Sequence, residues 1–415
     1  MLIHWLWLAT RPNLSDRVKV NLLRHFRDAE DIYYADGTAF STEEELSKDS
    51  LDALLDKDLT QAKKILDECD HKHIHILTYR DAAYPNRLRN IVDPPVVLYY
   101  KGRLPEFDAL PIIGVVGTRK ATPYGLTIAK RMGYQIAACG GIVVSGMAYG
   151  IDGMAMQGAL TAGSPVVGVL GNGVDVVYPQ SNRSLFADVE RAGCLLSEFA
   201  PGTEPFKWNF PKRNRIISGL SCGVLVIEAP EKSGALITAR QASDQGRDVF
   251  AVPGNIDMPS CAGSNELLRD GAMMASSGWD VMREYQAQFP DKIQNRCKPG
   301  LQMAYPDEVA RAAQEAEKPE LKVAQKPGIF GRKKSNRQKK IDNDQSSKYI
   351  GAEEKRPSLT EQEQAVFALV QEGKSLVDDI IAQTQLPAGV VLAALTMLEV
   401  KGLIVRLPGK RVKLK

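Results

Sequence analysis

The sequence IIGVVGTR, residues 112–119, runs from an unbroken apolar stretch into a glycine-bearing turn, and it decides the fold. Four later segments resemble it: GIVVSG at 141–146, VVGVLGNG at 166–173, GVLVI at 223–227 and DVFAV at 248–252. Segments of helical length, such as 124–138 and 152–162, lie between these runs. Apolar strands that alternate with helices are typical of an α/β fold with a parallel sheet covered on both faces. Right-handed crossovers then bring the glycine turns to the carboxyl edge of the sheet, where such folds bind ligands.

The 415 residues of the chain exceed what one hydrophobic core usually organises. We expect four parts: a helical N-terminal domain at 1–72, the α/β domain at 73–285, a basic disordered linker at 286–357 and a winged-helix domain at 358–415. Within the linker, residues 318–356 hold twelve Lys and Arg against five Asp and Glu, without apolar periodicity. In the last part, Thr360 and Glu363 match a capping box that opens the first of three helices, and a hairpin pattern follows them.

Composition excludes fully disordered and fibrous classes of protein. The chain is 44% hydrophobic and 25% charged, and its net charge of +3 does not by itself indicate nucleic-acid binding. No apolar stretch approaches a membrane span, and residues 1–9 lack a basic leader, so we expect a cytoplasmic protein. The six cysteines are scattered without CxxC spacing, and the five histidines all lie at or before residue 75. We therefore predict reduced thiols, no metal and no cofactor.

Residues at the strand–helix turns predict contacts with phosphate. Backbone N–H groups approach an anion closely only where side chains are small, and a helix N-terminus adds a favourable dipole. Seven candidates lie at three turns: Gly117, Thr118 and Arg119, then Ser145 and Gly146, then Gly234 and Thr238. Neither GxGxxG nor a Walker A lysine motif occurs, which favours a row of phosphates over a dinucleotide or triphosphate. Tight turns also need glycine without any ligand, and that alternative stays open.

A second cluster, KWNFPKRNR at residues 207–215, holds four cations and two aromatic residues within nine positions. Cations neutralise phosphates and aromatic faces stack on unpaired bases, a combination typical of single-strand binding without sequence preference. Six candidates come from this cluster: Lys207, Phe210, Lys212, Arg213, Asn214 and Arg215. The alternative is a solvated basic loop in which Trp208 and Phe210 pack into the core.

Longer strings connect these features to a known family. Between about residues 80 and 282 the chain carries GVVGTRKATPYG, SGMAYGIDGMAMQGAL, FPKRNRIISGLS and GSNELLRDGA. With these strings it resembles the DNA-processing protein A (DprA/Smf) family over half of its length. The resemblance implies an extended Rossmann-like domain that binds single-stranded DNA, usually as a homodimer. It also implies a recombination mediator that protects this DNA and helps to load the RecA recombinase, as in natural transformation, and not an enzyme.

The resemblance also implies roles for the candidate residues. It assigns backbone phosphate to the turns at 117–119 and 145–146. It assigns the closing of the pocket to Gly234 and Thr238, and charge and a stacking surface to Phe210, Arg213, Asn214 and Arg215. Two candidates, Lys207 and Lys212, rest on charge alone.

Two positions depart from the family, which usually has arginine where Tyr149 stands and often has histidine where Met156 stands. The first departure concerns a residue that could touch DNA. One DNA contact is therefore in doubt here, unless the tyrosine stacks on a base instead. Four apolar residues near the end of the domain are predicted for the dimer interface: Leu267, Leu268, Met273 and Met274.

Two other functions compete with the mediator. A nucleotide phosphoribohydrolase on a similar sheet would carry a catalytic glutamate after the glycine turn, but the segment at 233–241 offers none. A double-strand-binding regulator would act through the winged helix. The third helix of that domain, residues 390–400, is almost entirely apolar, which favours a protein contact or a structural role over reading of base edges.

Overall fold

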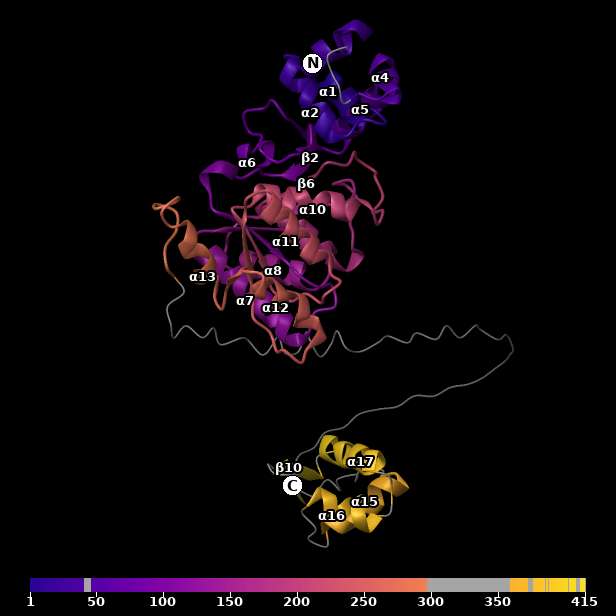
Figure 1. Cartoon of the computed structure of the whole chain (residues 1–415), viewed down its shortest axis with the longest axis vertical. Coiled ribbons are helices and arrows are strands. Elements are labelled where there is room, and N and C mark those ends of the chain that lie inside the picture. The colour runs from indigo at the N-terminus through magenta and orange to yellow at the C-terminus, as the bar shows by residue number, and fades with distance from the viewer. Residues whose placement is uncertain are drawn as a thin grey trace, which may run out of the picture. The chain divides into compact units, whose positions relative to one another are not determined.

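A computed structural model describes residues 1–40, 46–296, 359–371, 376–384, 386, 388–401, 403–407 and 411–414. The chain divides into two compact units, residues 1–322 and 323–415 (Figure 1). The predicted basic linker lies largely outside the described residues.

The first unit begins with helices, as the sequence predicts. They are α1 (Leu2–Thr10), α2 (Asp16–His25), α3 (Ala29–Tyr34), α4 (Lys48–Leu55) and α5 (Thr60–His71). Ser15 begins α2 as its N-cap, because its hydroxyl accepts a hydrogen bond from the backbone N–H of Val18 at 3.2 Å. Leu6, Trp7 and Leu8 of α1 are fully buried and form the centre of this helical part.

A nine-stranded sheet forms the body of the unit, in the order β1-β2-β6-β5-β4-β3-β7-β8-β9. The strands are β1 (His75–Thr78), β2 (Val97–Gly102), β3 (Ile112–Val116), β4 (Ile142–Ser145), β5 (Val166–Leu170), β6 (Cys194–Ser197), β7 (Gly223–Val226), β8 (Asp248–Ala251) and β9 (Met273–Met274). The seven strands β6-β5-β4-β3-β7-β8-β9, in their spatial order, all pair parallel with their neighbours. At the other edge, β1 pairs antiparallel with β2, and β2 pairs antiparallel with β6. The predicted parallel sheet is therefore confirmed, with two antiparallel strands added at one edge.

Helices cover both faces of this sheet. They are α6 (Asn86–Arg89), α7 (Pro123–Ala138), α8 (Ile151–Thr161), α9 (Arg183–Ala192), α10 (Asn209–Leu220), α11 (Gly234–Asp244), α12 (Ala262–Arg269) and α13 (Gly278–Met282). Short 3-10 helices occupy Gly37–Phe40, Phe107–Ala109, Gln180–Asn182, Pro259–Cys261 and Arg283–Tyr285. Alternate residues of β3 point to opposite faces: Val115 packs in the core that holds α7 and α8, and Val116 in the core that holds α10 and α11.

Order extends beyond the predicted end of the domain at residue 285. Phe289 and Ile293 are buried, and the N–H of Gln294 donates to the carbonyl of Cys139 at 3.1 Å. These two apolar residues lie four positions apart among polar neighbours, which is too short a pattern to show helical periodicity. The structure therefore places residues 286–296 on the α/β domain and not in a linker.

The second unit is the predicted winged helix. It consists of α15 (Glu361–Gln371), α16 (Val377–Thr384), α17 (Ala388–Val400) and the antiparallel strands β10 (Ile404–Leu407) and β11 (Arg411–Leu414). The capping box is present, because the N–H of Thr360 donates to Glu363 at 2.8 Å and the N–H of Glu363 donates to the Thr360 hydroxyl at 3.3 Å. On α17, Leu392 and Met397 are exposed, so its outer face is partly apolar. The predicted protein-contact role of this helix stays a prediction.

Candidate nucleic-acid interface

A hollow of about 590 Å³ opens at the carboxyl ends of β3 and β7. From β3 the chain moves outward through β4 to β6 on one side, and later through β7 to β9 on the other. Such a switch point is where open α/β sheets bind ligands. Nine of the thirteen predicted residues line the hollow: Gly117, Thr118, Arg119, Lys207, Phe210, Arg213, Asn214, Gly234 and Thr238. The structure therefore brings together turns that lie more than a hundred residues apart.

The loop between β3 and α7 forms one wall. A side chain at Gly117 would put its Cβ 2.5 Å from Ile151, so this glycine is needed for packing. The N–H of Thr118 donates to the carbonyl of Glu228 at 2.7 Å. The buried carboxylate of Glu228 accepts from the N–H and the hydroxyl of Thr122, at 3.0 and 3.1 Å. These bonds hold the loop in place and leave Arg119 exposed at its tip.

The floor of the hollow includes the ring of Phe210, and two guanidinium groups lie near that ring. Arg119 lies with its Cζ 5.0 Å from the centroid of the Phe210 ring, and Arg213 with its Cζ 5.9 Å from it. Tyr178 packs against the same ring, with centroids 5.6 Å apart. Gly171 leaves room for Phe210, because a Cβ there would come within 3.0 Å of the ring. A ring flanked by cations can stack on a base while its neighbours bind phosphate.

Arg213 is a buried cation beneath the hollow. It donates from Nη1 to the carbonyls of Gly146, at 2.9 Å, and Val169. Burial lowers the pKa of Arg213 to about 10, although the charge of Asp152 opposes the shift, so the side chain is still cationic at neutral pH. A Cβ at Gly146 would come within 2.5 Å of Arg213 Nη2 and 2.7 Å of the Asp152 carboxylate, so a larger residue would displace these buried side chains.

The turn after β4 faces inward. The Ser145 hydroxyl is buried and donates to the carbonyl of Val115 at 2.6 Å, and the N–H of Gly146 donates to Asp152 at 3.1 Å. Burial raises the pKa of Asp152, against the effect of Arg213. Both predicted residues of this turn thus have partners inside the protein, and their contact with DNA stays a prediction.

The start of α11 forms the opposite wall. Ser233 is its N-cap and accepts from the N–H of Ala235 at 3.3 Å. Asn214 donates from Nδ2 to the carbonyl of Gly234 at 3.4 Å, and the buried hydroxyl of Thr238 donates to the same carbonyl at 3.5 Å. A Cβ at Gly234 would meet no atom within 4 Å. Packing therefore does not require glycine there, and its absent side chain leaves the helix N-terminus open to the hollow.

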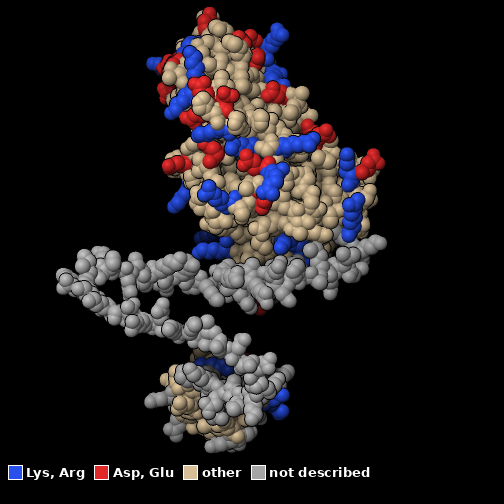
Figure 2. All heavy atoms as spheres, turned by 180° about the vertical axis from the view of Figure 1, so that it is seen from behind, with Lys and Arg blue, Asp and Glu red and all other residues tan. Residues whose placement is uncertain are grey.

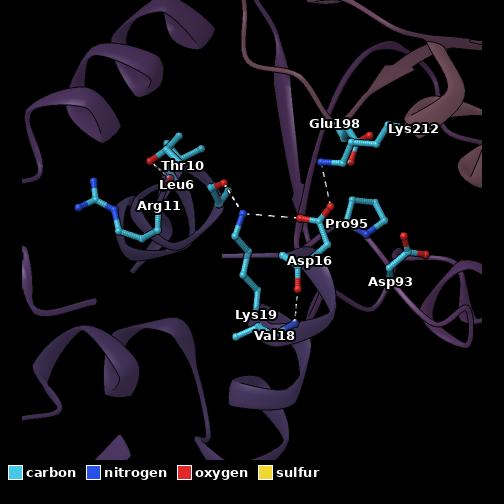
Figure 3. A network of polar contacts seen from close by, with 12 residues as sticks. Leu6, Thr10, Arg11, Asp16, Val18, Lys19, Asp93, Pro95, Glu198 and Lys212 are labelled. Carbon is cyan, nitrogen blue, oxygen red and sulfur yellow. Dashed lines mark hydrogen bonds and ion pairs between the residues drawn. The ribbon is translucent and has the colours of Figure 1, made fainter. Parts of the chain in front are cut away.

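Lys212 and Arg215 lie on another side of α10. Arg215 is 4% exposed and pairs with Asp16 at 3.0 Å, with Asp93 at 3.3 Å and with Glu198. Lys212 pairs with Asp16 at 2.9 Å and with Glu198 at 3.4 Å. Asp16, at the start of α2, lies between Lys19 and Lys212, with Glu198 and Asp93 beside them (Figure 3). These two cations join α10 to the helical part of the unit, and a separate hollow of about 580 Å³ lies there.

Burial and charge act in opposite directions in this network. Burial raises the pKa of Asp16, but the charges of Lys19, Lys212 and Arg215 outweigh it and hold that pKa below its ordinary value. For Glu198, burial dominates and raises the pKa in spite of Arg215. A DNA contact of Lys212 or Arg215 stays a prediction.

Several residues of the site were missed by sequence reasoning. Tyr178 lines the hollow and Glu228 holds the loop that carries Arg119, and neither was among the candidates, although both lie in strings that resemble the family. Trp208 does not pack into the core, since it is exposed beside Phe206. Tyr149 lines a smaller recess next to the hollow, which also borders Arg119 and Phe210.

Charged residues of both signs lie on the surface of the first unit (Figure 2). On the face that Figure 2 shows, Lys and Arg intermingle with Asp and Glu over the helical part and the sheet domain. That face carries no uniformly basic surface, in keeping with the net charge of +3. Within the described parts of the chain, no helix is both long and apolar enough to cross a membrane.

Comparisons with known proteins agree with this geometry. A family model described as DNA recombination-mediator protein A matches residues 75–286, and one described as the DprA winged helix domain matches residues 351–410. Protein Smf of Synechocystis sp. is 32% identical over 415 residues, which cover 98% of this chain and 97% of that protein. The DNA processing protein DprA of Bacillus subtilis is 43% identical over 211 residues, 51% of this chain and 71% of that protein. The solved structure of DNA processing protein A from Streptococcus pneumoniae has a TM-score of 0.57 and 31% identity, and the match covers 68% of this chain and 98% of that one.

Proposed function

The chain belongs to the DNA-processing protein A (DprA/Smf) family, and on that premise we propose that it binds single-stranded DNA in the hollow at the sheet edge. One observation carries the proposal. Exposed Arg119 and buried Arg213 flank the Phe210 ring, opposite the open N-terminus of α11. Cations, backbone amides and a stacking ring together suit phosphates and an unpaired base.

Each part of the hollow has its own task in this proposal. The exposed side chains of Arg119 and Lys207 neutralise backbone phosphates. The glycine-bearing turns at Gly117 and Gly234 let backbone approach the same phosphates closely, and Phe210 stacks on a base. Selectivity for single strands follows from that last contact, because bases in a duplex are stacked on one another and do not offer a face.

In this proposal, four other predicted residues position the site without contacting DNA. Ser145 and Gly146 fix the turn after β4 beneath Arg213. Lys212 and Arg215 hold α10 to the helical part through Asp16, and to the end of β6 through Glu198. Their effect on DNA binding is then indirect, through the position of Phe210 and Arg213 on the same helix.

We also propose that the protein acts as a mediator and not as an enzyme. The acids near the hollow have structural partners: Asp152 accepts from the N–H of Gly146, and Glu228 accepts from Thr122. A function in the cytoplasm, protecting single strands and loading RecA on them, fits a site that binds DNA without cleaving it. For the homodimer we propose the edge of the sheet at β9, with Leu267, Leu268, Met273 and Met274, of which Met274 is 64% exposed.

Equilibrium binding to an unstructured oligonucleotide tests the proposal. The single-stranded form should bind more tightly than the duplex, with an affinity that falls as salt rises. Equal binding of the two forms, or none, would contradict it. Release of a nucleobase from nucleoside monophosphates would favour the hydrolase instead. Loss of DNA binding on removal of the residues after Arg356 would favour the winged-helix regulator. If the protein binds single strands, loading of RecA can be tested next. On single-stranded DNA coated with this protein, ATP hydrolysis by RecA should begin earlier than on the same DNA without it.

A further inference from the structure

A pair of aromatic rings stands exposed on the loop that leads into α10. The rings of Phe206 and Trp208 stack with centroids 4.9 Å apart and planes only 4° from parallel. Phe206 is 43% exposed and Trp208 is 70% exposed. One face of the indole lies on the phenyl ring, so its exposed area comprises the opposite face and the edges. A large flat apolar surface thus faces solvent, and packing against the residues that the structure describes does not account for it.

The loop that carries the pair is held in place. Asn209 is buried, and its Nδ2 donates to the carbonyl of Gly171 at 2.9 Å. The N–H of Asn209 donates to the carbonyl of Phe206 at 3.0 Å, and the N–H of Gly202 donates to the Asp175 carboxylate at 2.8 Å. The two rings are therefore displayed on an ordered support, which lowers the entropy lost when a ligand binds to them.

The pair also borders the hollow. Pro205 and Lys207, the neighbours of Phe206 in the chain, both line it, and Lys207 is exposed. Phe210, two residues after Trp208, forms part of its floor. A strand that leaves the hollow beside Lys207 therefore meets the rings next, with a cation at hand for the phosphate between the two nucleotides.

We propose that Phe206 and Trp208 form a second stacking platform, which takes the base of the nucleotide just outside the hollow. This inference rests on the proposed function and extends it from one stacking site to two. A nucleobase suits the site because it is flat like the indole and arrives with a phosphate that Lys207 can neutralise. A base on the open indole face keeps its polar edges in water, so the platform accepts any base.

The fluorescence of Trp208 gives a direct readout in the full chain. Trp5 and Trp7 are buried, and Trp279 is partly buried, which leaves Trp208 as the exposed tryptophan of the described residues. Saturating oligothymidine should quench the emission of the unmodified protein. The quenching should disappear in Trp208→Phe, while most of the affinity stays, because phenylalanine can still stack.

Affinity provides the second measurement. Trp208→Ala should weaken the binding of an oligonucleotide that extends beyond the hollow by about 5- to 150-fold, the range for loss of one stacked base. An abasic site moved along the oligonucleotide should reveal two sensitive positions in the unmodified protein and one in Trp208→Ala. Tyr34→Ala is the matched control, because Tyr34 is also 70% exposed but lies on α3. Thermal unfolding of both variants should match that of the unmodified protein.

Failure of this inference differs from failure of the proposed function. Suppose that the unmodified protein binds single strands and that Trp208→Ala binds them equally tightly, with the same abasic pattern. The platform is then refuted, while the proposed binding site in the hollow is retained. If Trp208→Ala instead changes only the sedimentation of the protein, the rings contact a second copy, and the inference is overturned. If the unmodified protein does not bind single strands, the proposed function itself fails.

Discussion

Replacement of Gly234 tests whether this glycine is needed for a ligand, because packing within the described residues does not require it. Gly234 begins α11, and a Cβ there would meet no protein atom within 4 Å. Gly234→Ala should therefore stabilise the fold by about 0.4–1 kcal/mol, because alanine restricts the unfolded chain. For a domain of this size that raises the unfolding midpoint by roughly 1–4 °C. Gly234→Leu should fold as well, yet its side chain would fill the space in front of the helix N-terminus.

The expected effect on binding has the opposite sign. If Gly234→Leu removes one hydrogen bond to a phosphate, it should cost about 1.5–3 kcal/mol, or roughly 10- to 150-fold in affinity. Gly117→Ala is the contrasting variant, because its Cβ would lie 2.5 Å from Ile151. Overpacking there should lower the free energy of unfolding by about 1–3 kcal/mol. Thermal unfolding and fluorescence anisotropy with labelled oligothymidine measure both quantities. A Gly234→Leu protein that is stable and binds DNA normally would refute a ligand at this helix N-terminus.

Three further predictions concern charged residues. Arg119→Ala should weaken single-strand binding and flatten the slope of log affinity against log salt by about 0.7; an unchanged slope would remove Arg119 from the interface. Glu198→Gln should lower the free energy of unfolding in urea titrations at pH 7, since it removes the closest carboxylate of buried Arg215, and an unchanged stability would contradict this. The loss should stay below the about 3–5 kcal/mol for a buried charge left wholly unpaired, because Asp16 and Asp93 still pair with Arg215. The pKa of Asp16 is held below its ordinary value, so the charge of Asp16 should stabilise the fold above about pH 4. This stabilisation should be lost as the pH falls through the pKa that Asp16 has in the folded protein. The stability difference between the unmodified protein and Asp16→Asn should therefore be full at pH 7 and shrink in acid, and a constant difference would exclude that cause.

Much of the fold could be predicted because its signals are local. The run at Ile112–Val116 is β3 without a change of boundary, since five apolar residues end at a glycine. The capping box at Thr360 likewise depends on two residues three positions apart. The antiparallel addition of β1 and β2 was not predicted, because which edge a strand joins depends on pairing with β6, about a hundred residues later. Residues 286–296 were placed in the linker because two buried apolar side chains make too short a pattern.

The candidate site could be predicted as a set of residues but not as an arrangement. Glycine turns at strand ends gather at one edge of any parallel sheet, so five of the candidates from those turns meet there, and the fold adds four from the cluster at 207–215. The split of cations along α10 has no local signal. Arg213 and Lys212 are adjacent in sequence, yet one lies under the hollow and the other pairs with Asp16. Lys212 differs from Arg213 because it pairs with the carboxylates of Asp16 and Glu198, which only the fold brings close to α10.

The distribution of charge suggests what supplies affinity. Of the cations that line the hollow, Arg119, Lys207 and Lys232 are exposed, while Arg213 is buried against backbone carbonyls. Three exposed cations correspond to a salt slope of only about 2 for one protomer. If the hollow binds single strands as proposed, electrostatic attraction is modest, and stacking on Phe210 and hydrogen bonds from fixed backbone groups should supply much of the binding energy. These contacts require a fixed position of α10, because Phe210 lies on this helix. In the proposed function, the ion pairs of Lys212 and Arg215 with Asp16 and Glu198 would therefore affect DNA binding by holding that helix, although they lie outside the hollow.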